Sequence, residues 1–294
     1  MEFSILIPVY NTAIQALAQE LAKQAEELTP NFQILFIDDC SELSNSYLNQ
    51  KVKQLTNVDY QVLPENIGRA AIRNKLFLEA KYDLCIALDG DVSMLKNDFI
   101  KSYLSVLKDN NIIVGGHVYQ KEQPKDKAKN LHWYYGSKIE HRPVAERQAK
   151  PYASFMSANF ACSKQTFTRI QFDEKIEGYG HEDTLFGIKA EDLGIELLHI
   201  ANPVRHDGLD TADVFLAKQQ KAIHNLKLLY QNEDLKESLR RHSKLINLAR
   251  IRVFGFFFGL FRLAIYKNLN GANPNLILFQ MQKLIWWNQK EVKS

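Results

Sequence analysis

Two aspartates one residue apart, Asp89 and Asp91, directly follow a run of five apolar residues in the chain. Such a run, here residues 84–88, is typical of a buried strand in a parallel sheet. Ligands of open α/β sheets bind outside the carboxyl ends of these strands. Two carboxylates at that edge can hold a hard divalent cation, which in turn can bind a diphosphate. Because Asp-Gly is also common in turns, the motif by itself leaves an ordinary strand-end turn open.

Other carboxylate side chains and one imidazole also lie at predicted strand ends or turns. They are Asp38 and Asp39, Glu182 and Asp183, and His206. The carboxyl ends of parallel strands share one edge of a sheet, so segments distant in the sequence can converge on one cleft there. A carboxylate pair and an imidazole suit Mn²⁺ or Mg²⁺, with phosphate oxygens and water completing the shell. Solvated carboxylates are also common at strand ends, so each set alone can be an ordinary surface feature.

Strand and helix patterns alternate through the first part of the chain and predict the elements that position these side chains. The expected strands are 5–9, 33–37, 60–63, 84–88 and 112–114, and the expected helices are 13–28, 46–55, 68–80 and 98–108. Strands separated by helical stretches indicate βαβ units and a parallel sheet. We therefore predict an α/β fold with a largely parallel central sheet and helices on both faces.

The pattern changes in the middle of the chain. Residues 117–151 are polar, basic and aromatic without a clear period, and a connection of this length is usually functional or disordered. A glycine-rich turn at 177–180 precedes an expected helix at 184–193 and a strand at 196–200. Everything beyond Thr211 is predicted to be helical.

Composition excludes several classes of protein. With 294 residues, 46% hydrophobic and 24% charged, the chain has an ordinary globular composition. Neither a dinucleotide-binding G-x-G-x-x-G nor a phosphate-binding P-loop motif occurs, and we expect no nucleic-acid partner. The three cysteines fit no C-x-x-C pattern, so we expect them to be reduced. The first residues carry no signal-peptide pattern, so we expect a cytoplasmic protein.

Six motifs occur in chain order, and they are SILIPVYN (4–11), IDDCS (37–41), ENIGRAAIRN (65–74), LDGDV (88–92), SANF (157–160) and FDEKIEGYGHED (172–183). Together they resemble the successive motifs of family-2 glycosyltransferases with the GT-A fold. The last two resemble the acceptor-side motifs of chondroitin-polymerase-type and galactosyltransferase-type members. The resemblance implies a GT-A domain at 1–215, with a nucleotide-sugar half at 1–115 and an acceptor half at 116–215. Residues 216–294 would form a helical extension.

The resemblance also implies roles for individual residues on the donor side. The nucleotide-sugar site would consist of Pro8, Tyr10, Asp38, Asp39, Asn66, Gly68, Arg73 and Asp89. Asp39, or as a second choice Asp38, would accept a hydrogen bond from the base, which we expect to be uracil. Arg73 would help to hold the nucleotide, and Asp89 would contact ribose or a metal-bound water.

Metal and acceptor roles follow from the same resemblance. Asp91 and His206 would bind Mn²⁺ or Mg²⁺, with Asp89 as a further candidate ligand. Asp183 would be the general base, and Glu182 would bind or orient the acceptor. Two positions depart from the usual motifs, because Cys40 replaces a glycine and His181 stands where relatives often have glycine or alanine.

These assignments predict an inverting, metal-dependent hexosyltransferase. It would move a sugar from a UDP-sugar to a hydroxyl of a glycan or lipid-linked acceptor in surface polysaccharide synthesis. The cation would neutralise the diphosphate while the base takes the proton of the attacking hydroxyl. Two alternatives stay open, namely a nucleotidyltransferase and a catalytically silent scaffold that binds nucleotide sugars or membranes.

The final part of the chain differs in charge from the rest. Residues 216–294 contain 14 Lys and Arg against 4 Asp and Glu, whereas the preceding residues are net acidic. The apolar run at 253–261 is shorter than the ~20 residues that a membrane span requires. Aromatic and basic residues side by side predict that 244–294 lies on an anionic membrane surface at the inner face. The alternative is a helical subdomain that packs on the catalytic domain or forms a dimer.

Overall fold

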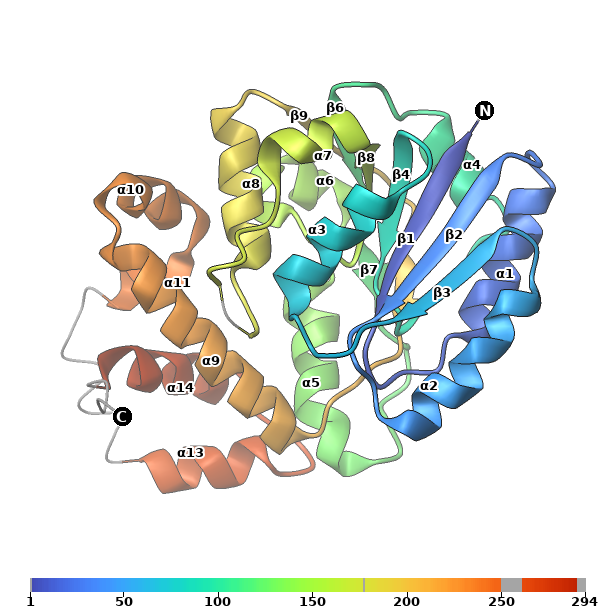
Figure 1. Ribbon diagram of the computed structural model, residues 1–294. Helices are drawn as coiled ribbons and strands as arrows, with labels where there is room; N and C mark the ends of the chain where they lie inside the picture. Colours follow the sequence, from blue (N-terminus) through green and yellow to red (C-terminus); the bar gives the residue numbers. More distant parts are fainter. Residues whose placement is uncertain (1, 177, 250–260, 290–294) are drawn as a thin grey trace. The chain divides into compact units, whose positions relative to one another are not determined.

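The structure is a computed structural model that describes residues 2–176, 178–249 and 261–289 (Figure 1). The chain forms two compact units, each assembled from separate stretches of sequence. Unit 1 comprises Met1–Gln120, His141–Lys175 and Leu185–Gly208, and unit 2 comprises Lys121–Glu140, Ile176–Thr184 and Leu209–Ser294. These units are defined by contacts, whereas the division at residue 215 is a division of the sequence and stays a prediction.

Unit 1 contains a seven-stranded sheet with the order β3-β2-β1-β4-β8-β6-β9 (Figure 1). Its strands are β1 (Phe3–Val9), β2 (Phe32–Asp38), β3 (Val58–Val62), β4 (Leu84–Leu88), β6 (Asn111–Val114), β8 (Asn159–Ser163) and β9 (Glu196–His199). All neighbours pair in parallel except β8, which runs antiparallel to both β4 and β6. The predicted α/β fold with a largely parallel sheet is therefore confirmed.

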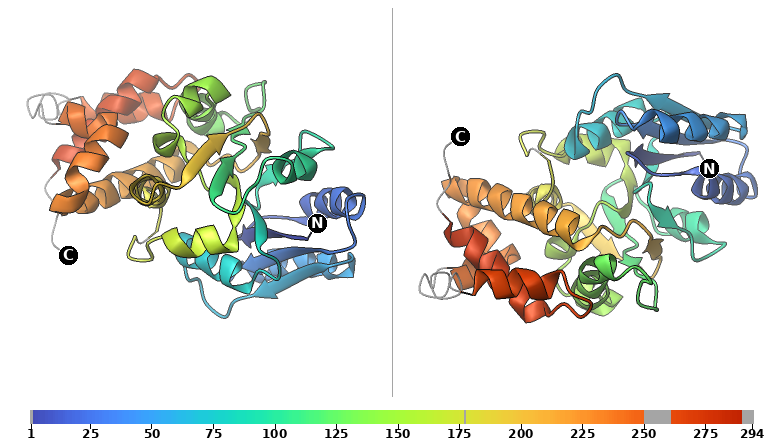
Figure 2. Two further views of the ribbon diagram at one scale, coloured as in Figure 1. Left: turned by 90° about the horizontal axis from the view of Figure 1, so that it is seen from above. Right: turned by 90° about the horizontal axis from the view of Figure 1, so that it is seen from below.

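Helices cover both faces of this sheet because successive side chains of a strand point to opposite sides. Ile5 and Ile7 of β1 pack in one apolar cluster, and Leu6 packs in the other. The first cluster includes α1 (Gln15–Glu26) and α4 (Phe99–Leu104). The second includes α3 (Arg69–Glu79), α7 (Lys164–Ile170) and the later turns of α8 (Glu182–Asp192). Figure 2 shows helices on either side of the sheet from two more directions.

A second, three-stranded sheet of unit 1 has the order β5-β10-β7. It consists of β5 (Val92–Ser93), β7 (His117–Val118) and β10 (Val204–His206). β5 directly follows the Asp89-Gly90-Asp91 turn, and β10 ends at His206. The small sheet therefore brings His206 next to the turn that follows β4, although 114 residues separate His206 from Val92, its partner in the pairing.

Several predicted elements differ in detail. The segment 117–151 is not irregular, since it contains β7, α5 (Asn130–Tyr135) and α6 (Val144–Gln148). The expected helix at 46–55 is the short α2 (Leu43–Asn49) followed by a 3₁₀ turn (Gln50–Gln54). Short elements with mixed polar composition carry weak periodicity, which explains why the sequence pattern missed them.

Unit 2 is helical in its described part beyond Thr211, as predicted. Its helices there are α9 (Ala212–Gln231), α10 (Glu233–His242), α11 (Lys244–Ala249), α13 (Arg262–Leu269) and α14 (Leu276–Asn288). An apolar cluster joins α5, α9, α13 and α14 through side chains such as Leu131, Phe215, Ile265 and Phe279. This cluster gives the unit its own core.

Candidate active site

The loops that follow β1 and β2 are bonded to each other. The Asn11 amide donates to Ser41 Oγ at 2.8 Å, and the Glu42 amide donates to Asn11 Oδ1, also at 2.8 Å. The neighbouring Tyr10 leaves 57% of its surface exposed at the same strand end. Pro8 is the last but one residue of β1. Its carbonyl oxygen lies close to Gly90 in the loop that follows β4. The predicted base-binding loop is thus held by hydrogen bonds to the loop after β2 and carries an exposed aromatic ring.

Asp38 and Asp39 occupy different environments although they are adjacent. Asp38 is fully buried, and its carboxylate accepts hydrogen bonds from the Ser41 amide at 2.7 Å and from the Tyr60 hydroxyl. Burial, followed by the bond to Asp38, raises the pKa of Tyr60 to about 12, so the phenol keeps its proton and donates it. Asp38 therefore stabilises the loop that follows β2, and the choice of Asp39 over Asp38 as the residue that binds the base stays a prediction.

Both carboxylate oxygens of Asp39 accept backbone hydrogen bonds at the start of α3. The Ile67 amide donates to Oδ1 at 2.7 Å, and the Gly68 amide donates to Oδ2 at 3.0 Å. Gly68 precedes the helix at φ +86°, a conformation that favours glycine. Asn66 donates its side-chain amide to the Asp39 carbonyl at 3.0 Å. Burial raises the pKa of Asp39, the two amides lower it and the Asp38 charge adds to the rise.

Each carboxylate oxygen has a second lone pair, so Asp39 can still accept a bond from a ligand.

Cys40 and His181, the two departures from the family motifs, share one backbone property. Cys40 adopts φ +62° and His181 adopts φ +73°, both in the left-handed region. The backbone at these positions therefore has the conformation that favours glycine, while the side chain has changed.

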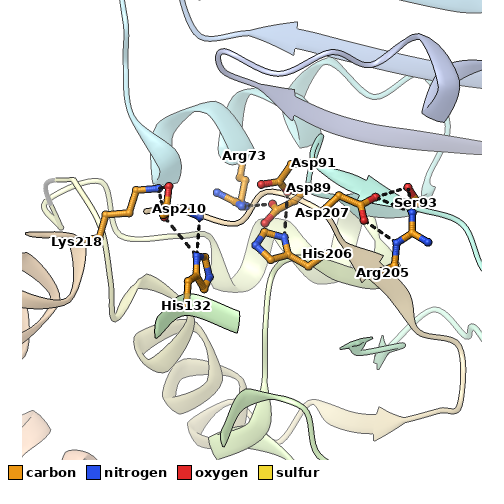
Figure 3. A network of polar contacts seen from close by, with 10 residues as sticks. All are labelled: Arg73, Asp89, Asp91, Ser93, His132, Arg205, His206, Asp207, Asp210 and Lys218. Atoms are coloured by element: carbon orange, nitrogen blue, oxygen red, sulfur yellow. Dashed lines mark hydrogen bonds and ion pairs between the residues drawn. The ribbon is translucent and has the colours of Figure 1, made fainter. Parts of the chain in front are cut away.

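Asp89 pairs with Arg73 of α3 (Figure 3). The Arg73 guanidinium, almost fully buried, donates to Asp89 Oδ1 and to the Arg69 carbonyl, the latter at 3.1 Å. The Asp89 amide donates to the Ala158 carbonyl at 3.0 Å. In this structure Arg73 therefore fixes the direction of the Asp89 carboxylate.

Asp91 faces His206 across the junction of the two sheets (Figure 3). Asp91 Oδ1 lies 3.4 Å from His206 Nδ1. This oxygen is buried and has no hydrogen-bond partner within the described part of the chain. Burial alone would raise the pKa of Asp91, but His206 and the Arg69 charge outweigh burial and lower it. The carboxylate is therefore charged, with Oδ1 turned toward His206 and the rest of the side chain partly exposed, and a cation could bind there.

Two glycines allow this close approach. A Cβ atom at Gly208 would lie 2.0 Å from Asp91 Oδ2, and one at Gly90 would lie 2.9 Å from the Pro8 carbonyl. In addition, the Asp207 amide donates to the Asp91 carbonyl at 2.9 Å. Sequence analysis did not identify Gly208, because its importance arises from a residue more than a hundred positions away.

His206 has two ring neighbours that sequence analysis also missed. The Tyr119 ring is edge-on to His206 with centroids 5.5 Å apart, and the His117 ring lies 6.3 Å away. Tyr119 is also edge-on to His117 at 5.3 Å. These rings limit the rotation of the His206 imidazole.

The donor set fits a divalent cation with two protein ligands. A carboxylate oxygen and an imidazole nitrogen 3.4 Å apart can both reach one ion, since metal–ligand bonds are about 2.0–2.2 Å long. No group of three His, Cys, Asp or Glu side chains with metal-binding geometry occurs within residues 2–176, 178–249 and 261–289. Asp89, which is paired with Arg73, is therefore not gathered with Asp91 and His206, and its role as a ligand stays a prediction.

The predicted acceptor residues Glu182 and Asp183 begin helix α8. Glu182 is buried, and its carboxylate accepts a hydrogen bond from the Gly180 amide at 2.9 Å. Asn225 of α9 donates to the Gly180 carbonyl at 3.3 Å, which fixes the glycine-rich turn within unit 2. One oxygen of Asp183 is buried as well. The positive end of the helix dipole favours a charged carboxylate at this position.

Comparison with known families identifies the class of protein. Residues 4–173 match the model of the family described as Glycosyl transferase family 2. Because the match covers more than half of the chain, the chain belongs to this family. No curated protein matches the chain.

Solved structures with a similar fold include a mannosyltransferase, a fragment of TarS and a glucosyl-3-phosphoglycerate synthase. The mannosyltransferase PcManGT from Pyrobaculum calidifontis, solved with GDP-Man and Mn²⁺, is 12% identical with a TM-score of 0.57, over 98% of this chain and 86% of that one. A fragment of S. aureus TarS, residues 1–349, is 18% identical with a TM-score of 0.51, over 77% of this chain.

The third is glucosyl-3-phosphoglycerate synthase from Mycobacterium tuberculosis, solved with Mn²⁺, UDP and glucosyl-3-phosphoglycerate. It is 13% identical with a TM-score of 0.50, over 77% of this chain and 79% of that one. This chain spans 65% of the TarS fragment. At these identities the likeness shows the fold alone, and it agrees with the GT-A fold expected from the motifs.

We predict that Gly208→Ala weakens Mn²⁺-dependent binding of UDP by about 10–100-fold, the effect typical of disturbing the support of a metal ligand. The added methyl group would overlap Asp91 Oδ2 and displace the carboxylate. Isothermal titration calorimetry of UDP with and without Mn²⁺ measures the effect.

Gly194→Ala is the matched control, because a Cβ at Gly194 meets nothing within 4 Å although its φ is +61°. The control should lower stability without changing the metal dependence. Wild-type affinity in Gly208→Ala would show that the position of Asp91 does not matter for binding.

Proposed function

We propose that the chain is an inverting, metal-dependent glycosyltransferase that moves a sugar from a UDP-sugar to a hydroxyl of a glycan or lipid-linked acceptor. The observation that carries the proposal is the Asp91–His206 pair at the carboxyl edge of the unit 1 sheet, within a family-2 chain. Surface polysaccharide synthesis is the expected setting. The proposal includes the resemblance of motifs 157–160 and 172–183 to the acceptor-side motifs of chondroitin-polymerase-type and galactosyltransferase-type members.

Donor binding would use the loops after β1, β2 and β4. The Tyr10 ring is exposed and can pack against the base, while Asp39 is held by two amides and can accept its N–H group. Arg73 forms an ion pair with Asp89, which lies two residues before Asp91 in the same turn. Pro8, Asn66 and Gly68 shape the backbone around the base. A UDP-sugar laid along this edge would place its diphosphate near Asp91.

A Mn²⁺ or Mg²⁺ ion held by Asp91 and His206 would neutralise the diphosphate and improve the leaving group. The remaining steps belong to the side chains of the protein. Asp183 would take the proton of the acceptor hydroxyl as the hydroxyl attacks the anomeric carbon. Glu182 would bind or orient the acceptor, and its carboxylate also accepts a hydrogen bond from the Gly180 amide of the glycine-rich turn. One displacement of this kind inverts the anomeric configuration.

Two other functions are less well supported. A nucleotidyltransferase usually has a glycine-rich, basic loop after its first strand, whereas this chain has Pro8 to Thr12 there. A silent scaffold would have no need for an Asp91 carboxylate that turns one buried oxygen toward His206. Release of UDP from a UDP-sugar in the presence of Mn²⁺ distinguishes the enzyme from the scaffold.

Asp183→Asn should reduce turnover by ~10² or more while UDP affinity stays within a few-fold, because the base acts on the acceptor. A thermal-shift screen with Mn²⁺ first selects the nucleotide sugar that stabilises the protein most. Release of nucleoside diphosphate from this donor, with calorimetry of UDP binding, then separates turnover from binding.

Asp192→Asn, an exposed residue of the same helix, is the control and should behave as the wild type. Near-normal turnover of Asp183→Asn would remove Asp183 from the mechanism. Retention of the anomeric configuration in the product would overturn the inverting reaction.

We further propose that 244–294 holds the protein at an anionic membrane surface. Much of the aromatic run at 253–261 lies outside the described residues, but its end and helix α13 do not. Phe261 is 63% exposed and Leu263 is 86% exposed, with the exposed basic residues Arg262 and Lys267 beside them. None of the described helices is long and apolar enough to span a membrane.

Flotation with vesicles tests this surface. Wild-type protein should bind anionic vesicles at low salt and detach as salt rises, because each basic residue contributes about 1 kcal/mol that salt screens. The double substitution Arg262→Glu and Lys267→Glu should weaken binding by at least about 10-fold. Leu78→Ser, at an exposed leucine of unit 1, is the control. A tail that ignores anionic vesicles and instead forms a salt-resistant dimer would contradict the membrane role.

A further inference from the structure

A buried arginine of unit 1, Arg147 in helix α6, has acceptors for all five of its N–H groups. It is 7% exposed, and none of its acceptors is a carboxylate. The acceptors are the carbonyls of Arg142 (3.3 Å), Val114 (3.2 Å), Gly115 (3.1 Å) and Ile200 (2.9 Å), and His199 Nδ1 (2.8 Å). An arginine has five N–H donors in a fixed planar arrangement, so every donor of Arg147 is satisfied.

The bond to His199 defines the state of that histidine. Arg147 can only donate, so His199 Nδ1 must accept, and the ring proton is on Nε2. Nε2 lies 3.0 Å from the Pro151 carbonyl, which accepts this proton. Burial lowers the pKa of His199 to about 4, so the imidazole is neutral at physiological pH. His199 therefore adds no positive charge beside the Arg147 guanidinium.

The carbonyls that Arg147 binds lie where the large sheet passes into the small one. Val114 ends β6, and Gly115 lies in the two-residue link from β6 to β7. Ile200 follows β9 and begins the link to β10. One guanidinium thus ties together the two chain segments that enter β7 and β10.

Gly116 completes the arrangement. Its φ is +82°, and a Cβ atom there would lie 2.8 Å from Arg147 Cζ, so the backbone rests directly on the guanidinium. The Gly116 carbonyl accepts hydrogen bonds from the Val204 amide (3.2 Å) and the Asn159 side chain (2.7 Å). Val204 is the first residue of β10, the strand that ends at His206.

We propose that Arg147 is a positioning residue for the donor site, acting through the β6–β7 and β9–β10 links to set the place of His206 opposite Asp91. The inference rests on the proposed function, because it concerns the metal-binding pair of that site. Arg147 is too deeply buried to touch a donor, so its effect would be indirect. A lysine would keep the charge but has three donors on a single atom and cannot reach acceptors on both links.

The test measures UDP affinity by calorimetry with Mn²⁺ and with a chelator. Arg147→Lys should lower Mn²⁺-dependent UDP affinity by about 10-fold, the lower end of the loss expected for a residue that supports a metal ligand. UDP binding in the chelator should not change. Arg169→Lys, at an exposed arginine of unit 1 that bonds Asn110, is the control and should bind as the wild type.

A double-mutant cycle with His206→Ala separates positioning from a general structural effect. If Arg147 acts through His206, Arg147→Lys should cause no further loss in the His206→Ala background. A wild-type affinity in Arg147→Lys, or an equal loss in both backgrounds, would overturn the inference. Wild-type protein that binds UDP equally with and without Mn²⁺ would overturn the proposed function as well, which distinguishes the two failures.

A milder variant is available if Arg147→Lys does not fold. His199→Ala removes one of the five acceptors and should lower Mn²⁺-dependent UDP affinity by about 3-fold, the value of one hydrogen bond. A folded His199→Ala protein with unchanged affinity would also overturn the inference.

Discussion

The contact between Asp91 and the chain around His206 joins the two sheets of unit 1, and the donor site depends on it. Asp91 uses three of its oxygens there: its carbonyl accepts the Asp207 amide, Oδ2 lies against Gly208, and Oδ1 faces His206. The contact requires a residue without a side chain at position 208. It also requires strand β10 of the small sheet to place His206 opposite Asp91, and we propose that Arg147 sets this placement. The interaction is therefore local in space but depends on three distant segments of sequence.

Asp38, Asp39 and Asp91 lie at the same edge of the sheet, but their carboxylates have different partners. These partners indicate a different role for each carboxylate. Asp38 is enclosed by Tyr60 and Ser41 and serves the fold. Asp39 is oriented by two amides and keeps lone pairs for a ligand. Asp91 is partly exposed, but its Oδ1 is buried beside an imidazole and lacks a hydrogen bond within the described residues. Burial makes such an oxygen costly unless a cation completes its shell, so the arrangement is understandable if the protein binds one.

Sequence patterns predicted the parallel strands and the acidic residues at their ends, because buried strands have long apolar runs that are easy to recognise. The convergence of Asp91 and His206 was also expected from their places at predicted strand ends, and the family resemblance implied that both bind the metal. Gly208, Tyr119 and Arg147 could not be predicted, since each matters through partners far away in sequence and none belongs to a periodic pattern. A buried arginine is especially hard to foresee, because arginine is usually exposed and no carboxylate in the motifs marks its place. Cys40 and His181 stood out as departures from the family motifs, but their positive φ angles could not be predicted, because neither residue is glycine.

The central claim is that Asp91 and His206 bind one divalent cation together with the diphosphate of the nucleotide. Electron spin echo envelope modulation of Mn²⁺ bound in the presence of UDP reports directly on nitrogen atoms attached to the ion. The account predicts modulation from one imidazole nitrogen in the wild-type protein and its loss in His206→Ala. Mn²⁺ and UDP bound to the wild-type protein without any imidazole coupling would contradict the account.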